Sequence, residues 1–426
     1  MKKWDKNIMR LLKSVGEKAD REGYSAFVVG GVVRDLILNR NNFDLDIVLE
    51  ADAVLFAQEF SRAYDASLIV YKQFKTATLV LPDGLKLDFA TARKEHYPFS
   101  ASLPVVSAGS IHDDLFRRDF TINAMALSLN KKQFGRLRDD FHGMEDLKRK
   151  KIRILHDQSF FDDPTRILRA VRFEQRFDFQ IEKKSLDVLK SALKKDAVGS
   201  VKPPRYFEEF KKNLSEECPA KSLKRLKDLG GLEFLDIKFK DFSKILKTIN
   251  RIEQNILWHK KQERPSETLE GWLIYFFALA EDASAGKMKT IGQQFNLKRT
   301  DREKMISSKK ILTLMKRLDS KTLKPSQIFR MLKPFSPEAI LFLKSKAPSP
   351  SVIKHIDDFL LKYEPVKLNV DGNDLVHMGI PQGKPVGDIL RTILHAKIDG
   401  FADTRDEELK IVQDFLRRKP KEFSDR

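Results

Sequence analysis

Two aspartates separated by one residue are the first candidates for chemistry in this sequence. Asp44 and Asp46 lie in residues 43–48, whose alternating apolar side chains predict a β-strand. Alternate side chains of a strand share a face, so both carboxylates are expected to point away from the core-facing Leu45 and Ile47. Paired carboxylates repel each other unless a cation lies between them, and such oxygen ligands suit Mg²⁺ shared with a triphosphate. An exposed acidic strand edge is the alternative interpretation, and it is the more common one for the aspartates alone.

A pair of glycines lies just upstream of these aspartates. Gly30 and Gly31 end a predicted buried strand and lead directly into a predicted helix that contains Arg34. Glycine permits close backbone approach, and amides at a helix N-terminus can bind phosphate oxygens with the help of an arginine. An ordinary tight turn is the alternative. The two motifs support each other, because a triphosphate needs both a phosphate-binding turn and metal-binding carboxylates.

Three arginines recur at every third residue further along the chain. Arg166, Arg169 and Arg172 lie in a predicted helix, and Asp163 lies near its start, so the four side chains are expected to form a polar stripe. A solvent-exposed face with salt bridges is the alternative interpretation.

A small mixed sheet is expected to position the first two motifs. An amphipathic helix at residues 4–15 precedes strands at residues 27–30, 43–48, 67–71, 76–81 and 85–90. Asp88 lies on the last of these strands, either as a third carboxylate of the site or as a structural residue. Residues 93–111 contain Pro98, Pro104 and Gly109 and predict a long irregular connection.

Composition limits the class of protein. With 426 residues, 41% of them hydrophobic, the chain can form sizeable cores, and its single cysteine, Cys218, excludes an internal disulfide framework. No apolar stretch long enough for a membrane helix and no signal-like start occurs, so a soluble protein of a reducing, cytoplasmic compartment is expected. The net charge of +19 favours a polyanionic partner such as nucleic acid, although a merely soluble basic surface is the alternative. No cysteine or histidine cluster has the spacing of a zinc site, so no zinc is expected.

The motifs together resemble those of class II tRNA nucleotidyltransferases and poly(A) polymerases. Residues 30–35 followed by Asp44 and Asp46 resemble the signature of the superfamily that includes DNA polymerase β. Residues 117–126 resemble the ribose-binding segment of the family, and residues 140–153 resemble its hinge motif. Residues 162–173 resemble the segment that reads the incoming base.

This resemblance implies a role for each matching residue. Asp44 and Asp46 would be the catalytic residues and the ligands of Mg²⁺, and Asp163 with Arg166 would pair with the base of CTP or ATP. The nucleotide-binding residues would be Gly30, Gly31, Arg34, Arg117, Arg118, Asp119, Asn123, Asp163, Arg166, Arg169 and Arg172. The connection at residues 93–111 would be the mobile element that switches the enzyme from C to A addition.

The chain departs from the family pattern at two positions beside the base-reading segment. Asp162 stands where many members have Glu, and Pro204 stands where the next family motif begins with an acid. These departures fit either a narrower choice of nucleotide, such as addition of the terminal A alone, or ordinary variation within the family.

The expected fold is α+β, with a polymerase-β-like head followed by helical regions. The expected domains are a nucleotidyltransferase head at residues 1–155, a helical neck at 156–235, a helical RNA-binding body at 236–362 and a small RNA-binding tail at 363–426. The implied function is addition of CCA, or of its terminal A, to the 3′ end of tRNA from CTP and ATP, without a nucleic acid template and by nucleotidyl transfer with two Mg²⁺ ions. Addition of A alone, poly(A) synthesis and an inactive RNA-binding relative remain as alternatives.

Overall fold

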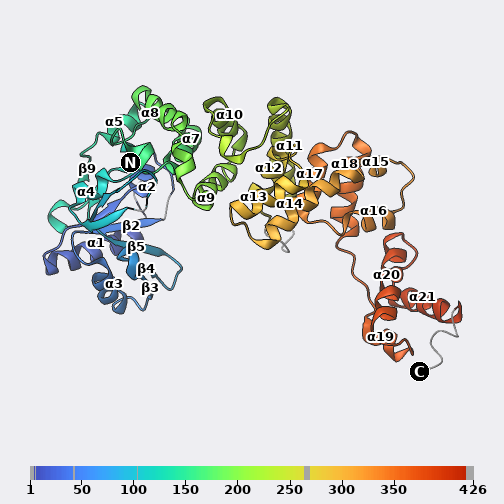
Figure 1. Ribbon diagram of the computed structural model, residues 1–426. Helices are drawn as coiled ribbons and strands as arrows, with labels where there is room; N and C mark the ends of the chain where they lie inside the picture. Colours follow the sequence, from blue (N-terminus) through green and yellow to red (C-terminus); the bar gives the residue numbers. More distant parts are fainter. Residues whose placement is uncertain (1–3, 5, 42–43, 103, 263–268, 419–426) are drawn as a thin grey trace. The chain divides into compact units, whose positions relative to one another are not determined.

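The computed structural model describes residues 4, 6–41, 44–102, 104–262 and 269–418. The chain divides into two compact units, Met1–Asp236 and Ile237–Arg426, and each is described by itself (Figure 1). Phe43, the first residue of the strand expected at residues 43–48, lies outside the described residues. The four domain boundaries expected from the sequence stay predictions.

A mixed sheet of seven strands forms the centre of the first unit, in the order β3-β4-β5-β2-β1-β8-β9 (Figure 1). Strand β2 pairs with β5 in parallel, whereas the other neighbouring strands of this sheet are antiparallel. The mixed sheet expected from the sequence is therefore confirmed. Its strands are β1 Ala26–Val29, β2 Leu45–Leu49, β3 Ser67–Tyr71, β4 Thr76–Val80, β5 Lys86–Thr91, β8 Ala126–Ser128 and β9 Leu137–Arg138.

Helices pack against this sheet because their apolar faces need cover. Helix α1, Lys6–Glu22, packs against β1, and α3, Ala53–Arg62, packs against β4 and β5. The short helix α4, Ile111–Phe116, contributes Ile111 and Leu115 to a buried cluster with side chains of β1 and β2. Helix α4 is thereby fixed to the two strands that flank the candidate site.

The segment after β5 differs from the expectation of an irregular connection. Strand β6, Arg93–His96, pairs with β7, Val105–Ala108, as an antiparallel hairpin. The residues of β7 are exposed and those of β6 are charged, so neither strand shows the apolar alternation that reveals a half-buried strand. The prediction was wrong for the strands because backbone pairing, rather than burial of apolar side chains, defines them.

The rest of the first unit is helical apart from one short parallel pair, β10 Lys151–Ile152 with β11 Gln180–Ile181. Helix α7 packs against both α9 and α10. The helices of the unit not yet given are α2 Gly31–Ile37, α5 Gly143–Lys148, α6 Ser159–Asp162, α7 Thr165–Phe177, α8 Lys183–Lys194, α9 Pro203–Leu214 and α10 Pro219–Leu229.

The described part of the second unit is helical, as expected. Helix α12 is buried on all sides, because its sequence is apolar all round, and it packs against α11, α14 and α17. The helices are α11 Phe242–Lys260, α12 Gly271–Leu279, α13 Ala285–Gln294, α14 Arg299–Ile311, α15 Met315–Leu318, α16 Pro325–Leu332, α17 Pro337–Lys346, α18 Pro350–Asp358, α19 Gly372–His377, α20 Lys384–Ile398 and α21 Arg405–Arg418.

Helices α19 to α21 form a separate small core within this unit. Val370, Ile389, Ile393 and Val412 are buried together there. Buried Glu408 accepts hydrogen bonds from the amides of residues 369 and 370 and pairs with Lys397 at 2.6 Å. Across the parts of the chain that the structure describes, no helix combines the length and apolar character needed to span a membrane.

Candidate active site

The acidic side of the candidate site lies on two neighbouring parallel strands. Asp46 on β2 stands at the same register position as Asp88 on β5, and Asp44 lies just before β2. Burial raises the pKa of Asp46 to about 6; the charge of Arg118 opposes this rise, whereas the charges of Asp44, Asp88 and Asp114 add to it. The structure therefore brings these carboxylates close enough to repel one another, which is the condition that a bound cation relieves.

The glycine turn lies directly beside Asp46. Gly30 has φ of 78°, in the region that favours glycine, and precedes helix α2. A Cβ atom on Gly30 would lie 2.6 Å from Nη1 of Arg118 and 3.6 Å from Oδ2 of Asp46. Only glycine fits here, because both the backbone angle and the space beside the arginine exclude a side chain.

Arg117 and Arg118 share one buried carboxylate. Asp114 lies at 2.8 Å from Nη2 of Arg117 and at 3.0 Å from Nη2 of Arg118. Burial opposes ionisation of Asp114, but the two guanidinium groups hold its pKa below the ordinary value. Arg117 also pairs with Glu95 of strand β6, at 3.2 Å. The hairpin and helix α4 are thus both tied to the segment that resembles the ribose-binding motif.

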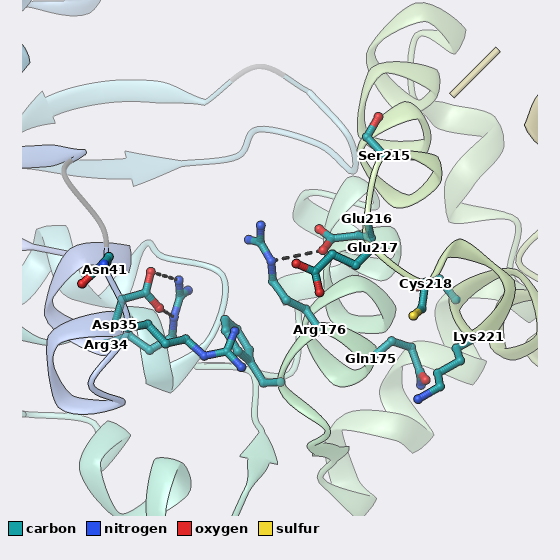
Figure 2. Close-up of a pocket in the computed structure, with 13 residues that line it drawn as sticks. Arg34, Asp35, Asn41, Gln175, Arg176, Ser215, Glu216, Glu217, Cys218 and Lys221 are labelled. Carbon is teal, nitrogen blue, oxygen red and sulfur yellow. Dashed lines mark hydrogen bonds and ion pairs between the residues drawn. The ribbon is translucent and has the colours of Figure 1, made fainter. Parts of the chain in front are cut away.

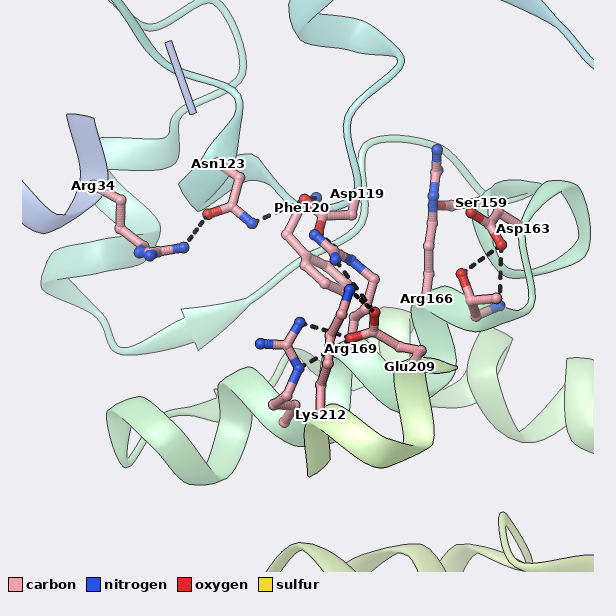
Figure 3. A network of polar contacts seen from close by, with 12 residues as sticks. Arg34, Asp119, Phe120, Asn123, Ser159, Asp163, Arg166, Arg169, Glu209 and Lys212 are labelled. Carbon is pink, nitrogen blue, oxygen red and sulfur yellow. Dashed lines mark hydrogen bonds and ion pairs between the residues drawn. The ribbon is translucent and has the colours of Figure 1, made fainter. Parts of the chain in front are cut away.

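Asp119 and Asn123 are central to a second polar network (Figure 3). Asn123 donates to Asp119 at 2.9 Å and accepts from Nη1 of Arg34 at 2.6 Å, while Nε of Arg169 donates to Asp119 at 2.8 Å. Burial alone would raise the pKa of Asp119, but chiefly the charge of Arg169 lowers it to about 2. Asp119 is therefore ionised and joins the head to helix α7.

Arg34 is buried within protein contacts. Its guanidinium also donates twice to Asp35, at 2.9 Å each, and lies 4.6 Å from the ring centre of Phe177. A cavity of about 560 Å³ opens beside Arg34 and Asp35, where Arg176 pairs with Glu216 at 3.1 Å (Figure 2). Its lining includes neither the aspartates of β2 and β5 nor the start of α7, so this cavity is distinct from the candidate centre.

The three arginines of helix α7 differ in their main partners, although Arg169 and Arg172 both lie near Glu209. Figure 3 shows Arg166 and Arg169. Arg166 donates to Ser159 at 2.6 Å and to the carbonyl of Arg117 at 2.8 Å. Arg169 reaches Asp119 as described, and Arg172 pairs with Glu209 of helix α9 at 2.7 Å. Arg166 and Arg169 thus both contact the segment at residues 117–126, whereas Arg172 joins α7 to α9.

Asp163 lies in the bend between α6 and α7. It accepts hydrogen bonds from the amide and hydroxyl of Thr165 and pairs with Arg205 at 2.9 Å. Tyr97 lies in the loop of the β6–β7 hairpin, and burial is the main reason that its pKa rises to about 12. The charges of Asp163 and Arg166 also act on this pKa, Asp163 raising it and Arg166 lowering it. The expected base-reading pair is therefore together, with the hairpin loop beside it.

The carboxylates fit a divalent ion that is shared with a substrate. Among the residues described, no group of three or more His, Cys, Asp or Glu side chains is placed to hold a metal ion by itself. Asp44 and Asp46 offer the hard oxygen ligands that Mg²⁺ prefers, and Mg²⁺ commonly completes its shell with phosphate oxygens and water. Asp88 accepts a hydrogen bond from Thr78, which fixes its orientation next to Asp46.

The sequence interpretation missed two carboxylates of the site, Asp114 and Glu95. A signal existed for Asp114, because it precedes Arg118 by one helical turn, the spacing of an ion pair on a helix surface. Glu95 offered no such signal, since its partner Arg117 is brought near only by the folding of the hairpin.

Comparison with known proteins agrees with this geometry. Residues 26–153 match the poly A polymerase head domain. The A-adding tRNA nucleotidyltransferase of Geobacter sulfurreducens is 33% identical over 94% of this chain, which spans 46% of the length of that relative. An apo CCA-adding enzyme has a TM-score of 0.80 at 33% identity, with 97% of each chain covered. A Thermotoga maritima CCA-adding enzyme complexed with tRNA has a TM-score of 0.75 at 34% identity, covering 97% of this chain and 96% of that one.

The head, with its carboxylate strand and glycine turn, has the fold of the polymerase-β-like nucleotidyltransferases. The chain belongs to the class II tRNA nucleotidyltransferase and poly(A) polymerase family. Members of this family use a divalent metal ion.

Proposed function

We propose that the chain transfers nucleotides from ATP and CTP to the 3′ end of tRNA, adding CCA or its terminal A. One observation carries this proposal: Asp46, its neighbouring carboxylates and the guanidinium of Arg118 meet at the Gly30 turn. Negative groups for a metal ion and positive groups for a triphosphate thus lie side by side. The names of the similar proteins above indicate that the nucleic acid is tRNA, and the net charge of +19 is in accord with such a polyanionic partner.

The side chains divide the work of the reaction between them. Asp44 and Asp46 would hold Mg²⁺, which would supply a lowered pKa of the attacking 3′-hydroxyl and positive charge for the triphosphate. Gly30 and Gly31 let the phosphates approach the backbone, and Arg118 donates to them from above the turn. Little covalent chemistry is left to the protein, because phosphoryl-type transfer depends mainly on positioning and charge.

The ribose and the base are bound by the segment at residues 117–123 and by helix α7. Asp119 and Asn123 orient the ribose side of the site, while Arg117 supports the phosphates. Arg34, Arg169 and Arg172 contribute through the buried networks that hold α2, the head and α9 against α7.

Choice of base is assigned to Asp163 and Arg166. A carboxylate and a guanidinium side by side can accept from and donate to the polar edge of cytosine or adenine, so the protein replaces a template. Arg205 and Thr165 hold Asp163, and Ser159 holds Arg166. The incoming base would have to compete with, or share, these protein contacts.

Helical regions complete the proposed architecture. We assign the head to residues 1–155, the neck to 156–235, and RNA binding to the body at 236–362 and the tail at 363–426. Recognition there would rest on phosphates and on the shape of the tRNA helix rather than on base sequence. A cytoplasmic location is proposed as well, in keeping with the single cysteine.

Addition of A alone is the second candidate, because the Geobacter sulfurreducens relative carries that name. Purified protein should be incubated with three tRNAs, one lacking CCA, one lacking only the final A and one complete, each with CTP or ATP. Use of CTP on the first tRNA supports CCA addition, and use of ATP on the second tRNA only supports A addition. Repeated ATP incorporation on the complete tRNA would indicate poly(A) synthesis, and no incorporation on any tRNA would refute the proposed function.

A further inference from the structure

Asp114 is the residue at which the two arginines of the site meet, although it belongs to no motif that the sequence interpretation used. Its side chain is fully buried, and the residue lies within helix α4. One carboxylate oxygen accepts from Nε and Nη2 of Arg117, at 2.9 Å and 2.8 Å, and the other accepts from Nη2 of Arg118 at 3.0 Å. Each carboxylate oxygen of Asp114 thus accepts from a different arginine, Oδ1 from Arg117 and Oδ2 from Arg118.

Arg118 keeps donors that no protein group uses. Its Nε is buried and has no hydrogen-bond partner within the described residues. Its Nη1 lies over Gly30. A Cβ atom added to Gly30 would lie 2.6 Å from this Nη1 and 3.6 Å from Oδ2 of Asp46. Protein contacts therefore leave this guanidinium partly unused, and Nη1 is the donor that a phosphate group at the Gly30 turn would meet.

Arg117 links Asp114 to the helix that carries Arg166. Its side chain lies between Asp114 and Glu95, and its backbone carbonyl accepts from Nη2 of Arg166 at 2.8 Å. Asp114 therefore stands between the turn that contacts phosphate and the residue assigned to the base.

We propose that Asp114 is a positioning residue for the triphosphate: it holds the Arg118 guanidinium above Gly30 so that its free donors face the phosphate oxygens. This proposal rests on the proposed function. A freed arginine side chain samples many rotamers, and a guanidinium binds phosphate well only in a fixed, planar orientation. The negative charge of Asp114 also repels a triphosphate. Neutralising this carboxylate therefore favours ATP binding through charge, while the loss of Arg118 positioning disfavours it.

Two substitutions separate positioning from charge. Asp114→Asn removes the charge, whereas Asp114→Glu keeps it and moves both oxygens by one methylene group. Binding of ATP and of adenosine is measured by calorimetry without tRNA, because adenosine lacks the phosphates that Arg118 would contact. The matched control is Glu174→Gln, which neutralises another buried carboxylate paired with an arginine, Arg225 at 2.8 Å.

The proposal expects Asp114→Glu to bind ATP about ten- to a hundredfold more weakly than the wild type, the range of one lost charged hydrogen bond. Asp114→Asn should lose less affinity, because removal of the negative charge offsets part of the loss. Affinity for adenosine should stay unchanged, and Glu174→Gln should change neither affinity. Unchanged or tighter ATP binding by Asp114→Glu would overturn the proposal, as would an equal loss for ATP and adenosine. If Asp114→Asn does not fold, as judged by its thermal unfolding, Asp114→Glu decides alone.

A double-substitution cycle tests whether Asp114 acts through Arg118. Asp114→Glu should not weaken ATP binding further when Arg118 is already Ala, because the guanidinium that it positions is gone. Additive losses would show a general structural role and contradict the proposal. Failure of the proposed function is distinguishable, since it would appear as absent nucleotide incorporation by the wild type, whatever the Asp114 variants do.

Discussion

Asp46 on β2 and Asp88 on β5 stand side by side, at the same register position of two parallel strands. Successive strands of a sheet place such side chains about 5 Å apart on one face. The register of a short parallel pair thus creates a concentration of negative charge at the edge of the Gly30 turn, and burial makes that charge costly. Arg118 offsets it only in part, since the pKa of Asp46 still rises to about 6.

Neutralising Asp46 should stabilise the metal-free protein. The pKa of Asp46 rises from 3.8 to about 6, so the folded state binds its proton more tightly than the unfolded state does. The ionised group therefore destabilises the fold above that range, and we expect Asp46→Asn to gain about 1–3 kcal/mol in free energy of unfolding near neutral pH. The gain should shrink as the pH falls through about 6 and vanish near the unfolded pKa. Thermal unfolding in a chelator, across pH, measures it, and a variant less stable at neutral pH would contradict the calculation.

Gly30 should not tolerate even a methyl group. Gly30→Ala places Cβ 2.6 Å from Nη1 of Arg118 and strains a backbone with φ of 78°. We expect a stability loss of about 1–2 kcal/mol from the backbone alone and a large fall in nucleotide incorporation. Gly84→Ala is the matched control, because its φ is 85° but no atom lies within 4 Å of the added Cβ. Similar activity losses in the two variants would show that strain, not the site, is responsible.

Arg166→Ala should weaken the choice between CTP and ATP more than it weakens tRNA binding. Arg166 is buried and tied to Ser159 and to the carbonyl of Arg117, so its loss also loosens the start of α7. Competition between the two nucleotides in single-turnover incorporation gives the selectivity, and gel-shift titration gives the tRNA affinity. Exposed Arg149, which pairs with Glu145 on the surface, provides the control substitution to Ala. An Arg166 variant with unchanged selectivity would remove this residue from base reading.

Glu209 should matter for stability rather than for chemistry. It is buried and pairs with Arg172 at 2.7 Å, which joins α9 to α7. Glu209→Gln leaves the buried guanidinium of Arg172 with the more distant carboxylate of Glu216, at 3.6 Å. Breaking a buried pair costs about 3 kcal/mol, and we expect a loss of up to that size. Denaturant unfolding measures this loss, with the exposed neighbour Glu208→Gln as the control. Equal stabilities of the two variants would contradict the assignment of Glu209 to the α7–α9 contact.

Much of the fold was predictable because its elements carry local signals. The strands β1 to β5 have apolar or alternating residues, and the aspartates, glycines and arginines of the site occur in motifs that lie within single elements. The family resemblance then joined motifs that are far apart in sequence. The mixed sheet and the helical remainder follow from these patterns.

The contacts between elements could not be predicted in the same way. The exposed hairpin β6–β7 lacks an apolar pattern, and it alone explains why Glu95 meets Arg117. Asp163 pairs with Arg205 of helix α9, and no motif in the sequence links these two residues. Such pairings depend on long-range packing, for which a single sequence carries no periodic signal.

The central claim is that Asp46 holds the divalent ion at the Gly30 turn where nucleotide is transferred. Its most direct test is nucleotide incorporation into a tRNA that lacks its 3′ end, by wild type and by Asp46→Ala, alongside the tRNA affinity of each. We predict that the variant incorporates no nucleotide while its tRNA affinity stays nearly intact. Turnover by the variant equal to that of the wild type would contradict the claim.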